Sequence, residues 1–264
     1  MIGDPGPLKK ALEEAVGNAV SGKRIAVAFS GGLDSGIVAA FAKEHAEEAT
    51  LYTVGSENSH DIKEALTSAE ELGMRPVTIL ITEDDVMEGL REMIRLTGTK
   101  DPVTLSFELP LFHVCKNCEE DEILSGLGAD ELFAGYSKYI GLGKDDLRKS
   151  LEEDTRKLLE NTLPHERRIA EHFGKRMFYP FLDDMVVKEA RSLEMSGAVP
   201  TDDPMSRKRP LREVSDMIGC HGISAKEKKA AQYGSGSMGI IRKVCRKNNI
   251  TYAELIEAIC KEVG

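Results

Sequence analysis

Short apolar runs alternate with longer amphipathic stretches through the first half of the chain. The compact runs are rich in aliphatic residues, and we predict that they form strands at 25–29, 49–54, 76–81 and 122–124. Between them, apolar residues recur at helical spacing, which predicts helices at 7–20, 34–47, 60–72, 83–96 and 105–118. Strand and helix alternate at the spacing of βαβ units. The pattern therefore predicts an α/β fold with a doubly wound, mostly parallel sheet.

The second half of the chain has a purely helical pattern. Apolar positions predict helices at 145–160, 164–173, 183–193, 211–218, 240–247 and 252–261. We find no strong strand pattern beyond Tyr139, no internal repeat and no low-complexity linker. We therefore interpret residues 1–264 as a single domain, with an α/β core at 22–140 and a helical extension at 141–264.

Composition narrows the class of protein. The 264 residues carry a formal net charge of −10, and 41% of them are hydrophobic, which is enough for a core. An acidic chain argues against a large nucleic-acid interface, because phosphate backbones need positive patches. The sequence shows no signal peptide and no run as long as a membrane span, and its five cysteines give no disulfide framework. We expect a cytoplasmic protein without a membrane partner.

The six residues SGGLDS follow the first predicted strand and precede a helix. Gly31 and Gly32 let consecutive backbone N–H groups converge, and the helix N-terminus adds partial positive charge. Ser30 and Ser35 offer hydroxyl donors to phosphate oxygens. Asp34 is a carboxylate where phosphates would repel it, which fits a residue that holds Mg²⁺. The stretch thus predicts an anion site; the alternative is an ordinary βα turn of small residues.

The order S-G-G-x-D-S after a strand resembles the PP-loop of N-type ATP pyrophosphatases. It is not a Walker A loop, because no Gly-Lys-Ser/Thr sequence follows it. The resemblance implies that ATP is cleaved between its α- and β-phosphates.

A second glycine-rich stretch, LSGLGADELFAGY at 124–136, follows the fourth predicted strand. Ser125 and Gly126 lie just past the end of that strand, so they can face the same pocket as the first loop. Asp130 adds a second carboxylate at this edge of the sheet, and Mg²⁺ resolves the repulsion between two carboxylates and a triphosphate. The alternative is a strand-to-helix turn in which Asp130 and Glu131 favour the helix dipole.

The ordered set of motifs resembles the asparagine synthetase family. The stretch at 124–136 is similar to that family's G-x-G-[SA]-D-E-L-F-x-G-Y motif. The sequences PFLD at 180–183 and KRPLR at 208–212 are similar to two further motifs. Residues 53–61 resemble its second-strand loop, in which the backbone of Val54 would receive adenine. The resemblance covers the synthetase part of that family only.

The resemblance implies an Mg·ATP-dependent, AMP-forming ligase that joins a small-molecule carboxylate to ammonia or an amine. A carboxylate would attack the α-phosphate, and nitrogen would then displace AMP from the acyl-adenylate. Carried over by motif, the ATP site would comprise Ser30, Gly31, Gly32, Asp34, Ser35, Val54, Ser125 and Gly126, with Asp34 and Asp130 as the Mg²⁺ ligands. Lys228 would be catalytic, because the resembling enzymes carry a lysine at this distance before a glycine turn, here at 234–236.

Departures from the family pattern concern the nitrogen donor and the acceptor. Only about twenty residues precede the first strand and position 2 is Ile2, so we expect no glutaminase domain. Ammonia, an amine or a separate partner protein would then supply nitrogen. Leu127 stands where asparagine synthetases have Glu and β-lactam synthetases have Tyr, while Arg176 and Phe178 replace the Glu and Arg before PFLD. We expect these changes to lie where the acceptor binds, which makes aspartate a poor acceptor.

Two other functions stay open at this stage. One is a PP-loop tRNA-modifying enzyme, for which a redox or iron–sulfur role of Cys115 and Cys118 would be relevant, although packing on a helix is the simpler interpretation of this pair. The other is a nucleotide-binding partner protein without catalysis. The G-x-G-x-x-G sequence at 234–239 has no strand before it, so we interpret it as a mobile active-site loop.

Overall fold

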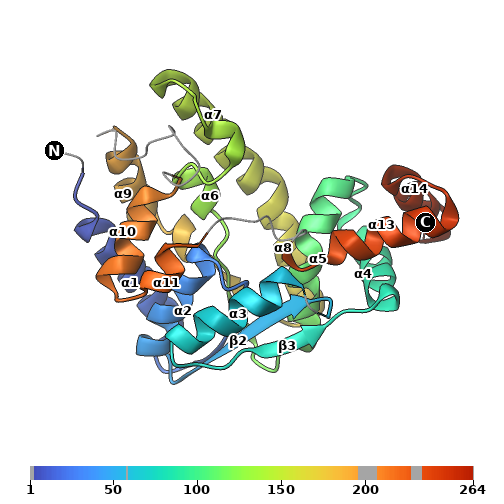
Figure 1. The fold of residues 1–264 in the computed structure, drawn as a ribbon, viewed down its shortest axis with the longest axis horizontal. Coiled ribbons are helices and arrows are strands. Elements are labelled where there is room, and N and C mark those ends of the chain that lie inside the picture. Colours follow the sequence, from blue (N-terminus) through green and yellow to red (C-terminus); the bar gives the residue numbers. More distant parts are fainter. Residues whose placement is uncertain (1–2, 58, 196–206, 227–233, 264) are drawn as a thin grey trace.

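The structure is a computed structural model that describes residues 3–57, 59–195, 207–226 and 234–263. Its centre is a five-stranded parallel sheet in the order β3-β2-β1-β4-β5 (Figure 1). The strands are β1 (Arg24–Ala28), β2 (Glu48–Gly55), β3 (Val77–Leu80), β4 (Glu122–Leu124) and β5 (Arg176–Phe178). The strand order changes direction between β1 and β4, which confirms the predicted doubly wound sheet.

Helices fill the connections and most of the second half of the chain. The α-helices are α1 (Gly6–Val20), α2 (Leu33–His45), α3 (His60–Glu71), α4 (Glu83–Thr97), α5 (Pro102–Asn117), α6 (Ala129–Leu132), α7 (Lys144–Lys157), α8 (Leu163–His172), α9 (Asp184–Met195), α10 (Arg209–Met217), α11 (His221–Ser224), α13 (Ser237–Asn248) and α14 (Tyr252–Val263). Short 3₁₀ turns occupy η1 (Ser137–Tyr139) and η3 (Pro180–Leu182), and η2 (Leu158–Thr162) is a π-helical turn. Within the described part of the chain, no helix combines the length and apolar character needed to cross a bilayer.

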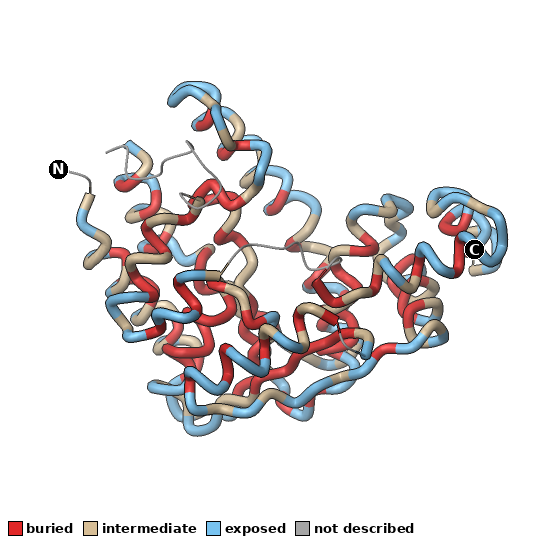
Figure 2. Tube along the Cα trace, in the orientation of Figure 1, coloured by how far each residue is buried: buried red, intermediate tan, exposed pale blue. Residues whose placement is uncertain are grey.

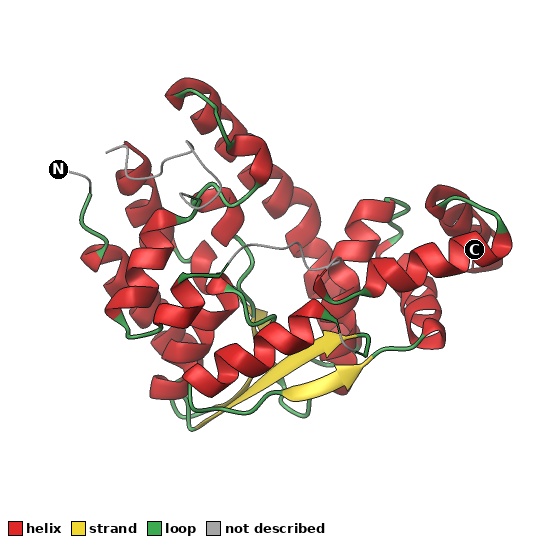
Figure 3. Cartoon of the chain, viewed as in Figure 1, coloured by secondary structure: helices red, strands yellow, loops and turns green. Residues whose placement is uncertain are grey.

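Helices cover both faces of the sheet (Figures 1 and 3). Successive residues of β1 point to opposite faces, so Ile25 and Val27 join one buried cluster while Ala26 joins the other. The first cluster includes α1, α2, α9 and α10, and the second includes α4, α5, α8, α13 and α14. Buried positions gather on β1, β2 and β4 and on the sheet-facing sides of these helices, whereas β3 is largely exposed (Figure 2). Both halves of the chain contribute to each face; their division into core and extension stays a prediction.

β5 contradicts our expectation of no strand beyond Tyr139. It pairs in parallel with β4, with Arg176 opposite Glu122 and Phe178 opposite Leu124. A strand of three residues is too short to show an alternating pattern in the sequence. Its position is fixed by pairing with β4, which is a tertiary contact rather than a local preference.

The first two helices predicted in the extension form one continuous helix. α7 passes into the π-helical turn η2, where the N–H of Leu163 donates to the carbonyl of Leu158, and then into α8. Pro164 has no N–H to give to an α-helical hydrogen bond, which favours a change of helical spacing at this point. The break that we predicted here is therefore a local widening of a helix and not a loop.

Candidate active site

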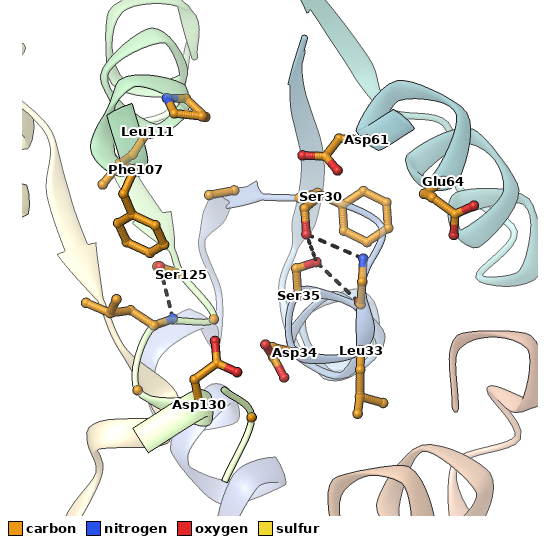
Figure 4. Close-up of a pocket in the computed structure, with 18 of the residues that line it drawn as sticks. Ser30, Leu33, Asp34, Ser35, Asp61, Glu64, Phe107, Leu111, Ser125 and Asp130 are labelled. Carbon is orange, nitrogen blue, oxygen red and sulfur yellow. Dashed lines mark hydrogen bonds between the residues drawn. The ribbon is translucent and has the colours of Figure 1, made fainter. Parts of the chain in front are cut away.

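A pocket lies at the carboxyl ends of β1, β2 and β4 (Figure 4). This is the switch point of the sheet, where open α/β sheets bind ligands. Most of the residues predicted to bind ATP or Mg²⁺ line it: Ser30, Gly32, Asp34, Ser35, Val54, Ser125, Gly126 and Asp130. The structure thus brings together residues that lie on three strand ends, and their individual roles remain predictions.

The loop between β1 and α2 exposes a helix N-terminus to the pocket. Ser30 Oγ lies 3.3 Å from Ser35 Oγ and accepts from Gly32 N–H at 3.4 Å. Among the described residues, no side chain caps α2 at Gly32. The N-terminus of α2 therefore lies at the pocket beside the two serine hydroxyls, an arrangement that suits an anion (Figure 4).

Gly31 belongs to this loop but does not line the pocket. Its φ is +76°, and a Cβ at this position would overlap the backbone of Glu64 and Ala65 on α3. Ser68 Oγ, also on α3, donates to the Gly31 carbonyl at 2.6 Å. Glycine is required here so that the loop can lie directly against α3.

The turn after β4 lies against Asp34. A Cβ on Gly126 would come within 3.1 Å of Asp34 Cβ, so the two loops are already in close contact. Ser125 is tied to the sheet by its N–H, which donates to the Phe178 carbonyl at 3.0 Å, and its Oγ accepts from Leu127 N–H. Pairing of β4 with β1 and β5 therefore positions this second loop opposite the first.

Lys208 joins the two carboxylates that we predicted to hold Mg²⁺. Its Nζ lies 2.5 Å from Asp34 Oδ2 and 2.7 Å from Asp130 Oδ1, and its side chain is only 4% exposed. Lys208 itself has a φ of +56°, and its N–H donates to the Phe133 carbonyl. Burial lowers the pKa of Lys208, and the Asp34 carboxylate offsets part of that effect.

Gly135 makes room for this ion cluster. A Cβ there would overlap both Asp130 Oδ1 and Lys208 Cε. The sequence placed Lys208 in the segment KRPLR but gave it no role. The available signal was the resemblance of that segment to a family motif, because nothing local to Lys208 indicates that it reaches Asp34.

The donor set fits Mg²⁺. Asp34 and Asp130 converge on one cationic group from two different loops, and carboxylate oxygens are the ligands that Mg²⁺ prefers. Their side chains are 19% and 13% exposed, so they remain accessible from the pocket. The same two residues could therefore hold Mg²⁺ that arrives with a triphosphate.

Further cations line the pocket near this cluster. Arg207, Arg212 and Lys226 are among its lining residues. Arg207 donates to the Gly135 carbonyl at 3.1 Å, and Lys226 pairs with Glu64 Oε2 at 2.5 Å. Together with Lys208 they give this side of the pocket the positive charge that a polyphosphate requires.

Three residues that depart from the family pattern were expected near the acceptor, and only one of them lines the pocket. Leu127 lines the pocket, as expected. Arg176 does not: it lies at the beginning of β5, largely exposed, and pairs with Glu122 at the opposite end of the sheet. Phe178 packs with the first buried cluster. The expectation that Arg176 and Phe178 lie where an acceptor binds is therefore wrong, because the pocket is formed at the carboxyl ends of the strands.

The Cys115–Cys118 pair is packed in the second buried cluster, whereas Cys220 belongs to the first. Burial raises the pKa of Cys118 to about 11 and that of Cys115 further, so both thiols stay protonated at neutral pH. In the ranges that the structure describes, the one group with metal-ligand spacing is Glu13, Glu44 and His45, and no cysteine belongs to it. These observations favour packing as the role of the pair.

The glycine turn at the beginning of α13 lies against the pocket wall. Ser235 is fully buried, and its carbonyl accepts from Ser56 N–H at 2.9 Å, in the loop that follows β2. A Cβ on Gly234 would overlap the carboxylate of Asp61, which lines the pocket. Lys228, which precedes this turn, lies outside the described residues, so its catalytic role stays a prediction.

Comparisons with known proteins agree with these motifs. The asparagine synthase family model matches residues 7–143. A putative asparagine synthetase [glutamine-hydrolyzing] of Methanocaldococcus jannaschii is 30% identical over 277 residues, which cover 91% of this chain and 51% of that protein. The human asparagine synthetase is 30% identical over 176 residues, which cover 61% of this chain and 31% of that protein. The chain thus spans about half the length, or less, of these curated relatives.

Solved structures with a similar arrangement are more distant. An NH3-dependent NAD synthetase from Campylobacter jejuni matches with a TM-score of 0.37 and 15% identity, covering 75% of this chain and 98% of that one. A U34-tRNA thiolase from Methanococcus maripaludis matches with a TM-score of 0.35 and 16% identity, covering 95% and 78%. The family match covers more than half of the chain and includes both pocket loops, and on that ground the chain belongs to the asparagine synthase family.

Proposed function

We propose that the protein is an Mg·ATP-dependent ligase that forms AMP and pyrophosphate while joining a small carboxylate to ammonia or an amine. The observation that carries this proposal is the Asp34–Lys208–Asp130 ion cluster beside an uncapped helix N-terminus. A triphosphate needs both parts: donors for its oxygens and cations beside them. Membership of the asparagine synthase family supports an ATP-using reaction of this class.

Residues of the first loop would hold the pyrophosphate part of ATP. The first N–H groups of α2 and the hydroxyls of Ser30 and Ser35 would donate to the phosphate oxygens, and Lys208 and Lys226 would add positive charge. Asp34 and Asp130 would hold Mg²⁺, which would neutralise part of the phosphate charge. Val54 lines the pocket at the end of β2, where its backbone can receive the adenine ring.

The reaction would proceed in two transfers. An oxygen of the substrate carboxylate attacks the α-phosphorus, and the bond to the β-phosphate oxygen breaks with release of pyrophosphate. Nitrogen then attacks the acyl carbon, the bond to the AMP oxygen breaks, and the nitrogen loses a proton. Each transfer moves negative charge onto a phosphate oxygen, which the cations of the pocket stabilise.

Product identity tests this function. Purified protein, Mg²⁺ and ATP would be incubated with a library of carboxylates, each combined with ammonia or with amines, and nucleotides and pyrophosphate would be quantified. We expect AMP and pyrophosphate in equal amounts from the productive pairs. ADP and inorganic phosphate as the products would contradict the proposal, and pyrophosphate release that depends on tRNA alone would favour the tRNA-modifying alternative.

Two controls use substrates of the family. We expect no glutamate from glutamine with this chain, and we expect little asparagine from aspartate and ammonia, because Leu127 cannot accept a proton as a glutamate could. Rapid asparagine synthesis would show that the pocket keeps the aspartate specificity of its relatives.

A further inference from the structure

One wall of the pocket is apolar and has no task in phosphate binding. Phe107, Pro110, Leu111 and Val114 on α5 line the pocket, and their spacing places them along a single face of the helix. Figure 4 shows Phe107 and Leu111 across the pocket from Asp61 and Glu64. Leu127 extends the apolar surface on the turn after β4. We call the four α5 side chains the α5 wall.

Glu166 on α8 adds a buried carboxyl group to the same end of the pocket. It lines the pocket, is 4% exposed, and its Oε2 has no hydrogen-bond partner among the described residues. Burial raises the pKa of Glu166 to about 8. The Tyr179 hydroxyl lowers this pKa, and the Glu131 carboxyl group raises it further. A buried carboxyl oxygen without a hydrogen bond is costly, so its presence needs an explanation.

Other acids surround Glu166. Glu131 also lines the pocket and accepts from the Tyr136 hydroxyl at 2.6 Å. Glu108, on α5, is 1% exposed, and burial together with the nearby Glu166 carboxyl group raises its pKa to about 9. Within the described ranges, no lysine or arginine pairs with Glu166, in contrast to Asp34 and Asp130. Burial raises the free energy of the ionised form of these acids; a substrate carboxylate would raise it further, whereas an ammonium group would lower it and form an ion pair.

We propose that this end of the pocket binds an organic primary amine, with its ammonium group on Glu166 and its apolar body against the α5 wall. The inference rests on the proposed function, in which this amine would supply the nitrogen. The two ends of the pocket would then bind opposite charges. The lysines and arginines would bind the phosphates and the carboxylate, and Glu166 would bind the amine.

Binding of a matched series of probes tests the amine site without turnover. Isothermal titration would compare phenethylamine, 2-phenylethanol and phenylacetate, which share an apolar body and differ in charge. Each titration would be run with and without Mg²⁺ and α,β-methylene-ATP, an analogue that cannot be cleaved at the α–β bond. We expect phenethylamine to bind at least about tenfold more tightly than the other two probes, as for a hydrogen bond to a charged group.

Variants identify the residues that bind the probe. Glu166→Gln keeps the size of the side chain and should weaken phenethylamine by at least about tenfold, with little change for 2-phenylethanol. Glu171→Gln, an exposed position on the same helix, is the matched control and should change nothing. Phe107→Ala should weaken phenethylamine and leave methylamine unchanged, which tests the α5 wall from a different element.

The outcomes separate this inference from the proposed function. If the nucleotide analogue binds but phenethylamine binds no better than 2-phenylethanol, or binds Glu166→Gln equally well, the amine site is refuted and the ligase proposal stands. If the analogue does not bind while the amine result holds, the ligase proposal fails and the amine site stands. Circular dichroism of each variant shows whether a loss of binding reflects a loss of fold.

Discussion

The phosphate side of the pocket and its α5 side differ in how their charged groups are paired. On the phosphate side, Asp34 and Asp130 share the ammonium group of Lys208, and two loops are in contact through glycine. On the α5 side, Glu166 is buried beside an apolar wall without a cation among the described residues. The first side is charge-balanced before any ligand binds, while on the second side burial keeps the proton on Glu166 until a ligand brings positive charge that stabilises its ionised form.

The comparison also separates what every member of this reaction class needs from what distinguishes one substrate from another. In the proposed reaction, phosphate recognition would use backbone N–H groups and a fixed pair of acids, which leaves little room for change. Recognition of the amine would use side chains from α5 and α8, with Leu127 on the turn after β4. We expect substitutions there to change specificity without disturbing the ATP site.

The largest effect should come from Asp34→Asn, which removes one of the two charges that face Lys208. We expect turnover to fall below detection, because Mg²⁺ would lose one of its two carboxylate ligands and could no longer neutralise the phosphate charge. Pyrophosphate release under saturating ATP measures it. Asp184→Asn, an exposed acid at the beginning of α9, should keep the full rate. Ordinary rates in Asp34→Asn would show that the ion cluster is only structural.

Lys208→Met tests whether the ammonium group balances the acid pair. Removing one partner of a buried ion cluster typically costs about 3–5 kcal/mol, so the free energy of unfolding should fall by that amount. Added Mg²⁺ should recover more stability in Lys208→Met than in the wild type, because the two carboxylates are then left to the metal. Urea denaturation with and without Mg²⁺ measures both effects. The exposed Lys188→Met is the control. Equal Mg²⁺ responses in all three proteins would contradict this role.

Lys228→Ala addresses the one predicted catalytic residue outside the described ranges. A cation that meets the charge developing on the α-phosphate should be worth about a hundredfold in turnover, with little change in ATP affinity. Its neighbour gives an internal comparison, because Lys229→Ala should be nearly neutral if only Lys228 reaches the nucleotide. Similar small losses in the two variants would identify both lysines as surface charges.

On the α5 side, the expected effect is a pH dependence of stability and not a loss of turnover. The pKa of Glu166 is raised to about 8 in the folded protein, from 4.5 when exposed. Between these values the folded state keeps a proton that the unfolded state has released, so stability falls as pH rises through this window and levels off above it. Glu166→Gln should lack this contribution. Its free energy of unfolding, relative to wild type, should therefore improve from pH 5 to pH 8.

Other titrating groups around Glu166 are common to both proteins. They are Glu131, Glu108, Tyr179 and Cys115, from α6, α5 and the segment after β5. The measured difference between wild type and variant therefore reports mainly on Glu166. Parallel pH profiles would show that this carboxyl group is solvated and ionised in the folded protein.

The sequence could predict that these two loops meet at one pocket because the constraints on each loop are local. Gly31 must adopt a positive φ against α3, and Asp34 follows three residues later in the first turn of α2, so one short stretch contains loop, helix start and carboxylate. The turn at Asp130 is equally compact. Strand and helix alternation then places both stretches at one edge of the sheet.

The rest depended on contacts between distant segments. Lys208 reaches Asp34 from 174 positions away in the sequence. Glu166 reads as one more charged residue on an amphipathic helix, and only the packing of α8 against α5 shows that it is buried. Arg176 illustrates the opposite error: its motif position suggested the acceptor site, but the direction of β5 takes it to the far end of the sheet.

The π-helical turn η2 has a consequence for how insertions and deletions would act on this family. The buried positions of the long helix run from Leu147 and Leu151 to Leu158, and across η2 they continue at Leu163 and Glu166. Each residue turns a helix by about 100°, and a π turn contains one residue more than an α turn. Deleting a single residue within η2 would bring Leu158 and Leu163 to the four-residue spacing of an α-helix and leave Glu166 on the buried face, whereas a deletion between Leu163 and Glu166 would rotate Glu166 by about 100° relative to Leu163. A one-residue gap at η2 in a relative would therefore leave this end of the pocket unchanged, although it lies in the same helix as Glu166.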